Sequence, residues 1–227
     1  MASQDKYVRA LTRRKWVMGF QKALIAWGKN NRNSFPWRKK VDPYSTLMAE
    51  IMLHRTQAAQ VKSVYKNFIK HYPTLTALTS GSRRGIRTIL KPLGLTWRIN
   101  AVFKMSRVLQ NKFNGTVPKQ KGDLLGLPGV GDYIANAVRC FAWSYPEPLV
   151  DTNTVRVVGR VFGLKTKDSS RRTKVFREII AKLVSTKKPR EFNYSLIDLA
   201  HNVCHKSKDP ECNICPLLRY CSYGKNR

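Results

Sequence analysis

The feature that most constrains this chain is a glycine-marked turn between two apolar segments, inside the stretch 124–160. Leu125 and Leu127 close one short apolar segment, and the sequence then reads Pro-Gly-Val-Gly over 128–131. Beyond the turn, apolar side chains recur at helical spacing at Tyr133, Ala137, Val138 and Phe141. The pattern predicts a helix, a tight hairpin over about 124–141, and a second helix.

Two glycines, Gly129 and Gly131, flank Val130 and leave backbone N–H groups unobstructed where the second helix begins. The partial positive charge of a helix N-terminus lies at the same place, so a phosphate can dock there without any side chain. About twenty residues further on, Asp151 opens another segment of helical periodicity. Its carboxylate is either a helix N-cap or an active-site anion.

The charge of the chain indicates a polyanionic partner. Lys and Arg number 43 against 13 Asp and Glu, which leaves a formal charge of +30. Nucleic acid is the leading candidate, because no apolar run approaches the roughly 18 residues that would span a membrane. The basic residues are spread along the chain, as on a surface that surrounds a duplex. The N-terminal stretch has no apolar signal core, so we expect an intracellular, cytoplasmic protein.

Helical periodicity runs through the whole chain, and sustained period-two alternation does not occur. The segment Val155 to Val161 is rich in branched residues that favour strands, but the spacing of its apolar positions fits a helix better. The sequence therefore predicts an all-α fold.

Four of the five cysteines crowd the end of the chain with the spacing C-x7-C-x2-C-x5-C, at Cys204, Cys212, Cys215 and Cys221. Four thiolates so close in sequence predict one metal centre, and in an intracellular protein this is favoured over two disulfides. The chemistry leaves zinc and an iron-sulfur cluster open. Cys140 is expected to be a buried apolar residue.

The hairpin LPGVG, the helix after it and the Val-Asp pair at 150–151 resemble the helix-hairpin-helix DNA glycosylase superfamily, whose members excise bases from DNA. The resemblance implies a six-helix barrel over 37–148 and a second lobe made of 1–36 with 149–227. Asp151 would lie at the junction and stabilise the positive charge that develops on the sugar.

The endonuclease III and MutY branches hold a 4Fe-4S cluster with C-x6-C-x2-C-x5-C, so the resemblance implies such a cluster here, with a first loop one residue longer. It also implies a monovalent cation at the hairpin, bound by the carbonyls of Leu125, Leu127 and Val130. Bifunctional members carry a lysine where this chain has Tyr133. A monofunctional glycosylase, with Tyr133 at the mouth of the base pocket, is therefore expected.

The target base is predicted from the stretch Ala49 to Gln57, which matches a MutY-type pattern. Glu50 stands where a glutamate protonates adenine, but the similar archaeal thymine/uracil mismatch glycosylases also have this carboxylate. His54 and Arg55 replace the glutamines usual in adenine glycosylases, and Leu95 offers an aliphatic wedge. We expect His54, Arg55 and Leu95 to contact DNA. Arg55 would hydrogen-bond the guanine left behind by the flipped base or contact a phosphate, and Leu95 would fill the vacated stack or belong to the core.

The chain ends six residues after Cys221, whereas MutY-type enzymes carry a further domain. These features favour a monomeric enzyme of base excision repair that removes thymine or uracil opposite guanine from double-stranded DNA. Excision of adenine opposite guanine or 8-oxoguanine is the alternative enzyme. A catalytically silent DNA-binding protein with a structural zinc is the alternative from another class.

Overall fold

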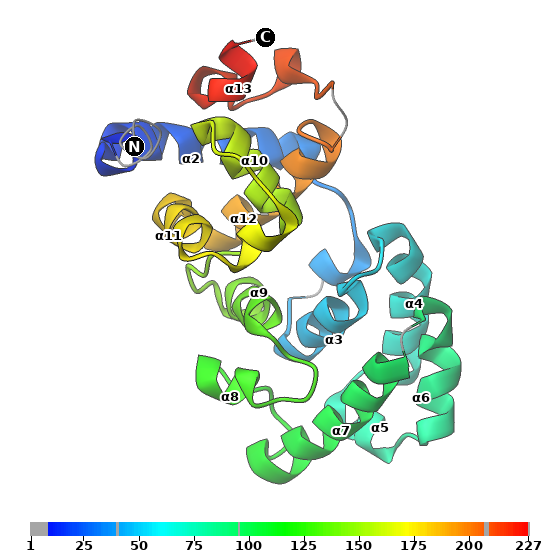
Figure 1. Ribbon diagram of the computed structural model, residues 1–227. Helices are drawn as coiled ribbons and strands as arrows, with labels where there is room; N and C mark the ends of the chain where they lie inside the picture. Colours follow the sequence, from blue (N-terminus) through cyan, green and yellow to red (C-terminus); the bar gives the residue numbers. More distant parts are fainter. Residues whose placement is uncertain (1–8, 40, 95, 207–208, 227) are drawn as a thin grey trace. The chain divides into compact units, whose positions relative to one another are not determined.

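The computed structural model describes residues 9–39, 41–94, 96–206 and 209–226. Within these ranges the regular structure is helical and contains no strand (Figure 1), which confirms the predicted all-α class. The branched segment that might have been a strand lies in helix α10 (Thr152–Phe162), where Val155, Val158 and Val161 are buried. The chain divides into two compact units: an internal unit, Ser34–Trp143, and a terminal unit, Met1–Asn33 with Ser144–Arg227.

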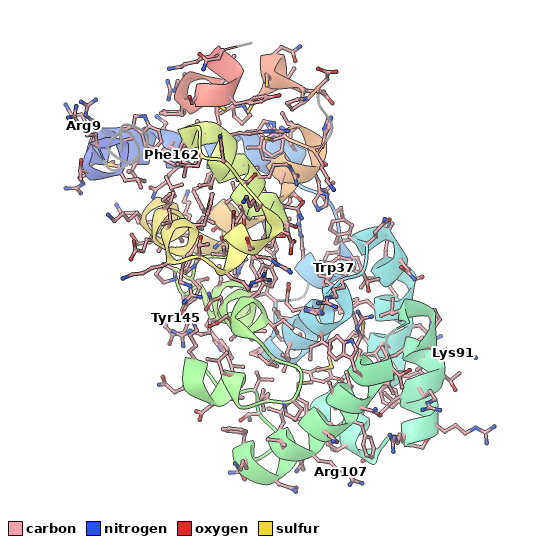
Figure 2. All side chains as sticks on the ribbon, viewed as in Figure 1. Arg9, Trp37, Lys91, Arg107, Tyr145 and Phe162 are labelled. Atoms are coloured by element: carbon pink, nitrogen blue, oxygen red, sulfur yellow. The ribbon has the colours of Figure 1, made fainter. Side chains whose placement is uncertain are left out.

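The internal unit is built from helices that follow one another along the chain. They are η1 (Pro36–Arg38), α3 (Pro43–Leu53), α4 (Ala58–His71), α5 (Leu75–Ser80), α6 (Arg83–Leu90), η2 (Lys91–Leu93), α7 (Thr96–Phe113), α8 (Lys121–Leu125) and α9 (Asp132–Trp143). Trp37, labelled in Figure 2, is buried at the start of the unit, with its ring against those of Phe35 and Tyr65.

Helix α3 is the central element of this unit, because it packs against α4, α7 and α9. Its start is fixed by sequence: Asp42 accepts a hydrogen bond from the Ser45 N–H at 2.9 Å, and Pro43 occupies the first turn, where its missing N–H costs nothing. Residues 44–52 are all buried. The helix thus carries Glu50 into the interior of the unit.

The terminal unit joins both ends of the chain. Its helices are α2 (Arg14–Asn31), α10, η3 (Asp168–Arg172), α11 (Lys174–Leu183), α12 (Pro189–Asn202), η4 (Cys212–Ile214), η5 (Leu218–Tyr220) and α13 (Ser222–Lys225). Helix α2 packs along α12, and a Cβ added at Gly28 would lie 1.9 Å from the Ser195 Oγ. Only glycine permits so close an approach. Phe20 and Leu24, four residues apart on α2, are both fully buried in the core of this unit.

Asn33 ends the N-terminal segment of the terminal unit with two hydrogen bonds to Asp198, which is fully buried on α12. The side-chain amide bond is 2.7 Å long and the backbone N–H bond 3.2 Å. A buried carboxylate held by two donors is compatible with a packed core. In the described part of the chain, no helix combines the length and the apolar character needed to cross a membrane.

Candidate active site and nucleic-acid interface

The predicted hairpin is present in the internal unit, between α8 and α9. Successive backbone hydrogen bonds of 3.1 Å tighten the turn, from Leu127 N–H to the Leu124 carbonyl and from Val130 N–H to the Leu127 carbonyl. The side chains of these three residues are buried and anchor the turn to the core. The Leu127 carbonyl, one of the three expected cation ligands, therefore already accepts a hydrogen bond from the Val130 N–H. Leu125, another of the three expected residues, has an exposed side chain.

The two glycines of the hairpin meet different surroundings. Gly129 has φ +82, and a Cβ there would lie 2.8 Å from the Ala101 Cβ on α7. Gly131 has no atom within 4 Å of the position of a Cβ, so its surroundings are open. Gly129 therefore allows the turn to fit against α7, while Gly131 leaves the N-terminus of α9 approachable. An anion can reach the first N–H groups of that helix.

Glu50 and Tyr133 both belong to the internal unit and to helices that pack together, α3 and α9. Glu50 lies in the last turn of α3 and is only 6% exposed. Tyr133 lies in the first turn of α9 and is half-buried against the apolar core. Glu50 is thus a nearly buried carboxyl group on the helix that packs against the helix of Tyr133.

The loop after α3 carries two of the predicted DNA contacts, His54 and Arg55, and both are exposed. Arg55 has φ +58, a left-handed conformation that is uncommon for a residue with a side chain. The His54 ring meets the Trp97 ring edge-on, with centroids 5.3 Å apart. The wedge candidate, Leu95, lies outside the described residues.

Trp97 and Arg98 at the start of α7 were not predicted from sequence. Trp97 is 38% exposed, and its ring is 3.6 Å from the position of a Cβ on Gly129, so it lies between the His54 loop and the hairpin. Arg98 is fully buried beneath it. A signal was present, because Arg98 falls on the stripe that continues through Val102, Met105 and Leu109 on α7. A charged residue on such an apolar stripe is rarely buried without a structural or functional reason.

Asp151 belongs to the terminal unit, where it caps α10. Its Oδ1 accepts hydrogen bonds from the N–H groups of Asn153 at 3.0 Å and Thr154 at 2.7 Å, and the Thr154 Oγ1 accepts one from the Asp151 N–H at 3.0 Å. The N-cap interpretation of this residue is therefore correct. The carboxylate remains half-buried and is held in one orientation, as a catalytic anion also requires.

A chain of hydrogen bonds, also not predicted, leads from Asp151 to the first cysteine. The Asn153 amide donates to Asp151 Oδ2 at 3.0 Å, and Arg156 Nη1 donates to Asn153 Oδ1 at 3.0 Å. Arg156 also donates to the carbonyls of Cys204, at 3.0 Å, and Ala200, at 2.8 Å. Burial lowers the pKa of Arg156, and the nearby Cys204 and Asp151 act in the opposite direction.

The four C-terminal cysteines are free thiols at the end of the terminal unit. The Glu211 N–H donates to the Val203 carbonyl at 3.1 Å and closes the first cysteine loop, in which residues 207–208 lie outside the described ranges. Arg160 Nη1 donates to the Cys204 Sγ at 3.2 Å, and the Gly224 N–H to the Cys221 Sγ at 3.4 Å. These sulfurs therefore have donors in place that would stabilise thiolates.

The surroundings of Cys215 oppose the ionisation of its thiol. Burial and the thiols of Cys204, Cys221 and Cys212 raise the pKa of Cys215 to about 11. As placed, however, no three His, Cys, Asp or Glu side chains of the described residues are arranged to hold a metal ion. The donor set itself fits a centre bound by four thiolates, since a bound metal deprotonates its thiols. Cys140 is separate from this group and fully buried, as predicted.

The fold and the glycine hairpin define a helical protein with a helix-hairpin-helix element. Residues 48–182 match the model of the HhH-GPD superfamily of base excision DNA repair proteins, and the chain belongs to this family. The matched range contains Glu50, the hairpin and Asp151, but not the four cysteines.

Individual relatives are similar over nearly the whole chain. The thymine/uracil-DNA glycosylase of Pyrobaculum aerophilum is 38% identical over 87% of this chain and 88% of its own length. The thymine-DNA glycosylase of Aeropyrum pernix is 35% identical over 92% and 96%. Among solved structures, a thermostable thymine-DNA glycosylase matches with a TM-score of 0.85 and 33% identity, over 93% of this chain and 97% of that one.

A second solved structure is a trapped covalent intermediate of endonuclease III with DNA. It matches with a TM-score of 0.76 and 25% identity, over 91% of this chain and 94% of that one. The helical fold is therefore of the endonuclease III type.

Proposed function

We propose that this protein is a monofunctional, mismatch-specific DNA glycosylase that hydrolyses the N-glycosidic bond of thymine or uracil opposite guanine. The observation that carries the proposal is its similarity, at 34–38% identity, to three thymine- or thymine/uracil-DNA glycosylases of which it covers 88–96%. The charge of +30 and the open N-terminus of α9 suit a duplex DNA substrate.

Asp151 is the proposed catalytic anion. Cleavage of the glycosidic bond puts positive charge on the sugar as the base departs, so a fixed carboxylate near C1′ lowers the barrier. At about 4 Å and an effective dielectric near 20, one carboxylate contributes roughly 4 kcal/mol, or about three powers of ten in rate. The capping hydrogen bonds hold the carboxylate in place before the substrate arrives, so little reorganisation is needed.

Tyr133 is the residue that makes the proposed reaction monofunctional. A tyrosine offers no amine to attack C1′, so the reaction ends with an intact abasic site. Its half-buried ring suits contact with the flipped base. Treatment with borohydride during turnover should trap no covalent protein-DNA adduct; a stable adduct would show that another amine attacks the sugar.

Glu50 supports both enzyme alternatives, because a buried carboxyl group can protonate either class of departing base. Adenine excision is favoured by one specific observation: adenine DNA glycosylases of Buchnera aphidicola and Mycobacterium tuberculosis are 31% and 33% identical. The chain spans only 59% and 64% of their lengths, however, against 88% or more for the thymine/uracil enzymes.

The test is base release, under single-turnover conditions, from four duplexes that differ in one pair: G·T, G·U, A·G and A·8-oxoguanine. Abasic sites are revealed by alkali. We expect release of thymine and uracil and much slower release of adenine. Preferential release of adenine would establish the alternative enzyme, and no release from any duplex would favour a silent DNA-binding protein.

We further propose that Cys204, Cys212, Cys215 and Cys221 hold a 4Fe-4S cluster that fastens the C-terminal loops and takes no part in bond cleavage. When bound, the cluster supplies a fixed centre that ties four segments of chain together. Protein purified anaerobically should be brown, with about four irons per chain by the chemistry of such clusters. Colourless protein with one zinc would instead support a structural zinc site.

A further inference from the structure

Arg98 is a buried cation whose described hydrogen bonds all run to two neighbouring loops of the internal unit. Its Nη2 donates to the His54 carbonyl and, at 2.9 Å, to the Thr56 Oγ1, while Nη1 donates to the Leu93 carbonyl at 3.3 Å. Its Nε has no hydrogen-bond partner among the described residues. The side chain is 0% exposed. A buried guanidinium is costly, so its presence here calls for a reason other than core packing.

The first loop depends on Arg98 for its shape. Arg55 holds a left-handed conformation, with φ +58, and is exposed. In this loop, Arg98 donates hydrogen bonds to the residues on either side of Arg55, which are His54 and Thr56. A backbone in this region persists only where its surroundings determine it, and here one buried side chain holds both flanks. The Thr56 N–H bond to the Leu53 carbonyl, 3.1 Å long, closes the same turn.

The second loop follows η2, and Arg98 binds the residue that precedes it. Leu93, whose carbonyl accepts from Arg98, ends η2, and Gly94 follows with φ +67 and an open position for a Cβ. Residue 95, the wedge candidate, comes next in the chain. One planar guanidinium with donors in fixed directions can therefore set the distance between the two loops, which a flexible lysine or an apolar side chain cannot do.

We propose that Arg98 is a positioning residue that fixes the spacing between loop 54–56 and residues 93–94, and thereby the contact of the protein with the base opposite the flipped nucleotide. The inference rests on the proposed function, in which these loops meet the opposite guanine. Arg98 itself, being fully buried, does not touch DNA. Trp97, whose ring centroid lies 5.9 Å from the Arg98 guanidinium, covers it on the exposed side.

The test compares Arg98→Lys and Arg98→Met with Arg107→Lys, a matched control on the same helix. Arg107, labelled in Figure 2, is exposed and lies over the Phe103 ring, more than two turns along α7 from Arg98. Thr56→Val is a milder variant that removes a single partner of Arg98. Thermal unfolding first identifies the variants that fold.

The first measurement is backbone hydrogen exchange in the free protein, by mass spectrometry of peptides covering 53–57 and 92–97. The N–H groups of Thr56 and Gly94 are hydrogen-bonded there, to the carbonyls of Leu53 and Lys91. Both Arg98 variants should speed exchange about tenfold or more in both peptides, as expected for the loss of a charge-assisted hydrogen bond. Thr56→Val should affect only 53–57, and Arg107→Lys neither. Unchanged exchange in a folded Arg98 variant would overturn the proposal.

The second measurement is single-turnover release of uracil opposite guanine and opposite a tetrahydrofuran residue, which presents no base to hold. The Arg98 variants should lose about tenfold or more in rate only opposite guanine. The reason is that a displaced loop 54–56 would lose the Arg55 contact with guanine, and one charge-assisted contact is worth about a factor of ten. Equal losses on both duplexes would mean that Arg98 is merely structural. If the native protein released uracil from neither, the proposed function would fail, while hydrogen exchange would still decide whether Arg98 holds the loops.

Discussion

Asp151 caps α10, and the proposed chemistry uses the same carboxylate, so two substitutions can separate the contributions. Asparagine is as good an N-cap as aspartate, whereas alanine costs about 1 kcal/mol. We expect Asp151→Asn to unfold like the native protein and Asp151→Ala to be less stable by about that amount. Both should lose base release by about a thousandfold while still binding DNA. Near-normal turnover in Asp151→Asn would rule out the catalytic role.

Arg156 gives a prediction about the segment that carries the four C-terminal cysteines. Its guanidinium bonds three groups at once: the Asn153 side chain and the carbonyls of Ala200 and Cys204. A lysine reaches one of them, so Arg156→Lys should lower the free energy of unfolding by about 1–3 kcal/mol and reduce the iron retained per chain. Arg171→Lys, at an exposed arginine on η3, is the control. Equal stability and equal iron in both variants would show that this link is not needed.

At the scale of elements, the hairpin contains two glycines that should respond differently to the same change. Gly129→Ala combines a positive φ with a Cβ 2.8 Å from Ala101, so it should destabilise the internal unit by about 1–3 kcal/mol. Gly131→Ala meets no atom within 4 Å and should fold normally, yet its methyl group stands where a phosphate would approach α9. Thermal unfolding and DNA affinity measure the two effects. Full affinity in Gly131→Ala would argue against phosphate docking there.

The packing of α3 against α4 predicts a dependence on pH. Burial raises the pKa of Tyr65 to about 12, from 10.0 in the unfolded chain. Because the folded pKa is the higher one, the stabilisation is complete below pH 10 and is lost as the pH rises towards 12. At pH 11 the loss is about 1.4 kcal/mol. Chemical unfolding at pH 9 and 11 should show a loss of stability that is larger in the native protein than in Tyr65→Phe by about this amount. Equal losses in the two proteins would refute the prediction.

Periodicity was enough to predict long helices such as α9 and α10, because each of these two buries an apolar stripe whose spacing can be read directly. Val155 and Val158 illustrate this, since helical spacing prevailed over their preference for strands. Arg98 and Asn153 were missed for a physical reason: their partners are main-chain carbonyls and side chains brought close only by folding. The cap at Asp151 was foreseeable from its place before a periodic segment, whereas the hydrogen-bonded chain to Cys204 was not.

At the scale of the whole molecule, the excess of 43 basic over 13 acidic residues gives the last prediction. Exposed cations such as Lys91 and Arg107 lie on the outer surface of the internal unit (Figure 2), so positive charge is not confined to the hairpin. If 6 to 10 phosphates are contacted, affinity for any duplex should fall about a thousandfold or more between 50 and 200 mM salt. Fluorescence anisotropy with a G·T and a fully paired duplex measures both slopes. The mismatch should raise affinity without changing the slope, because base contacts release few counterions. A flat response would mean that the charge serves another partner.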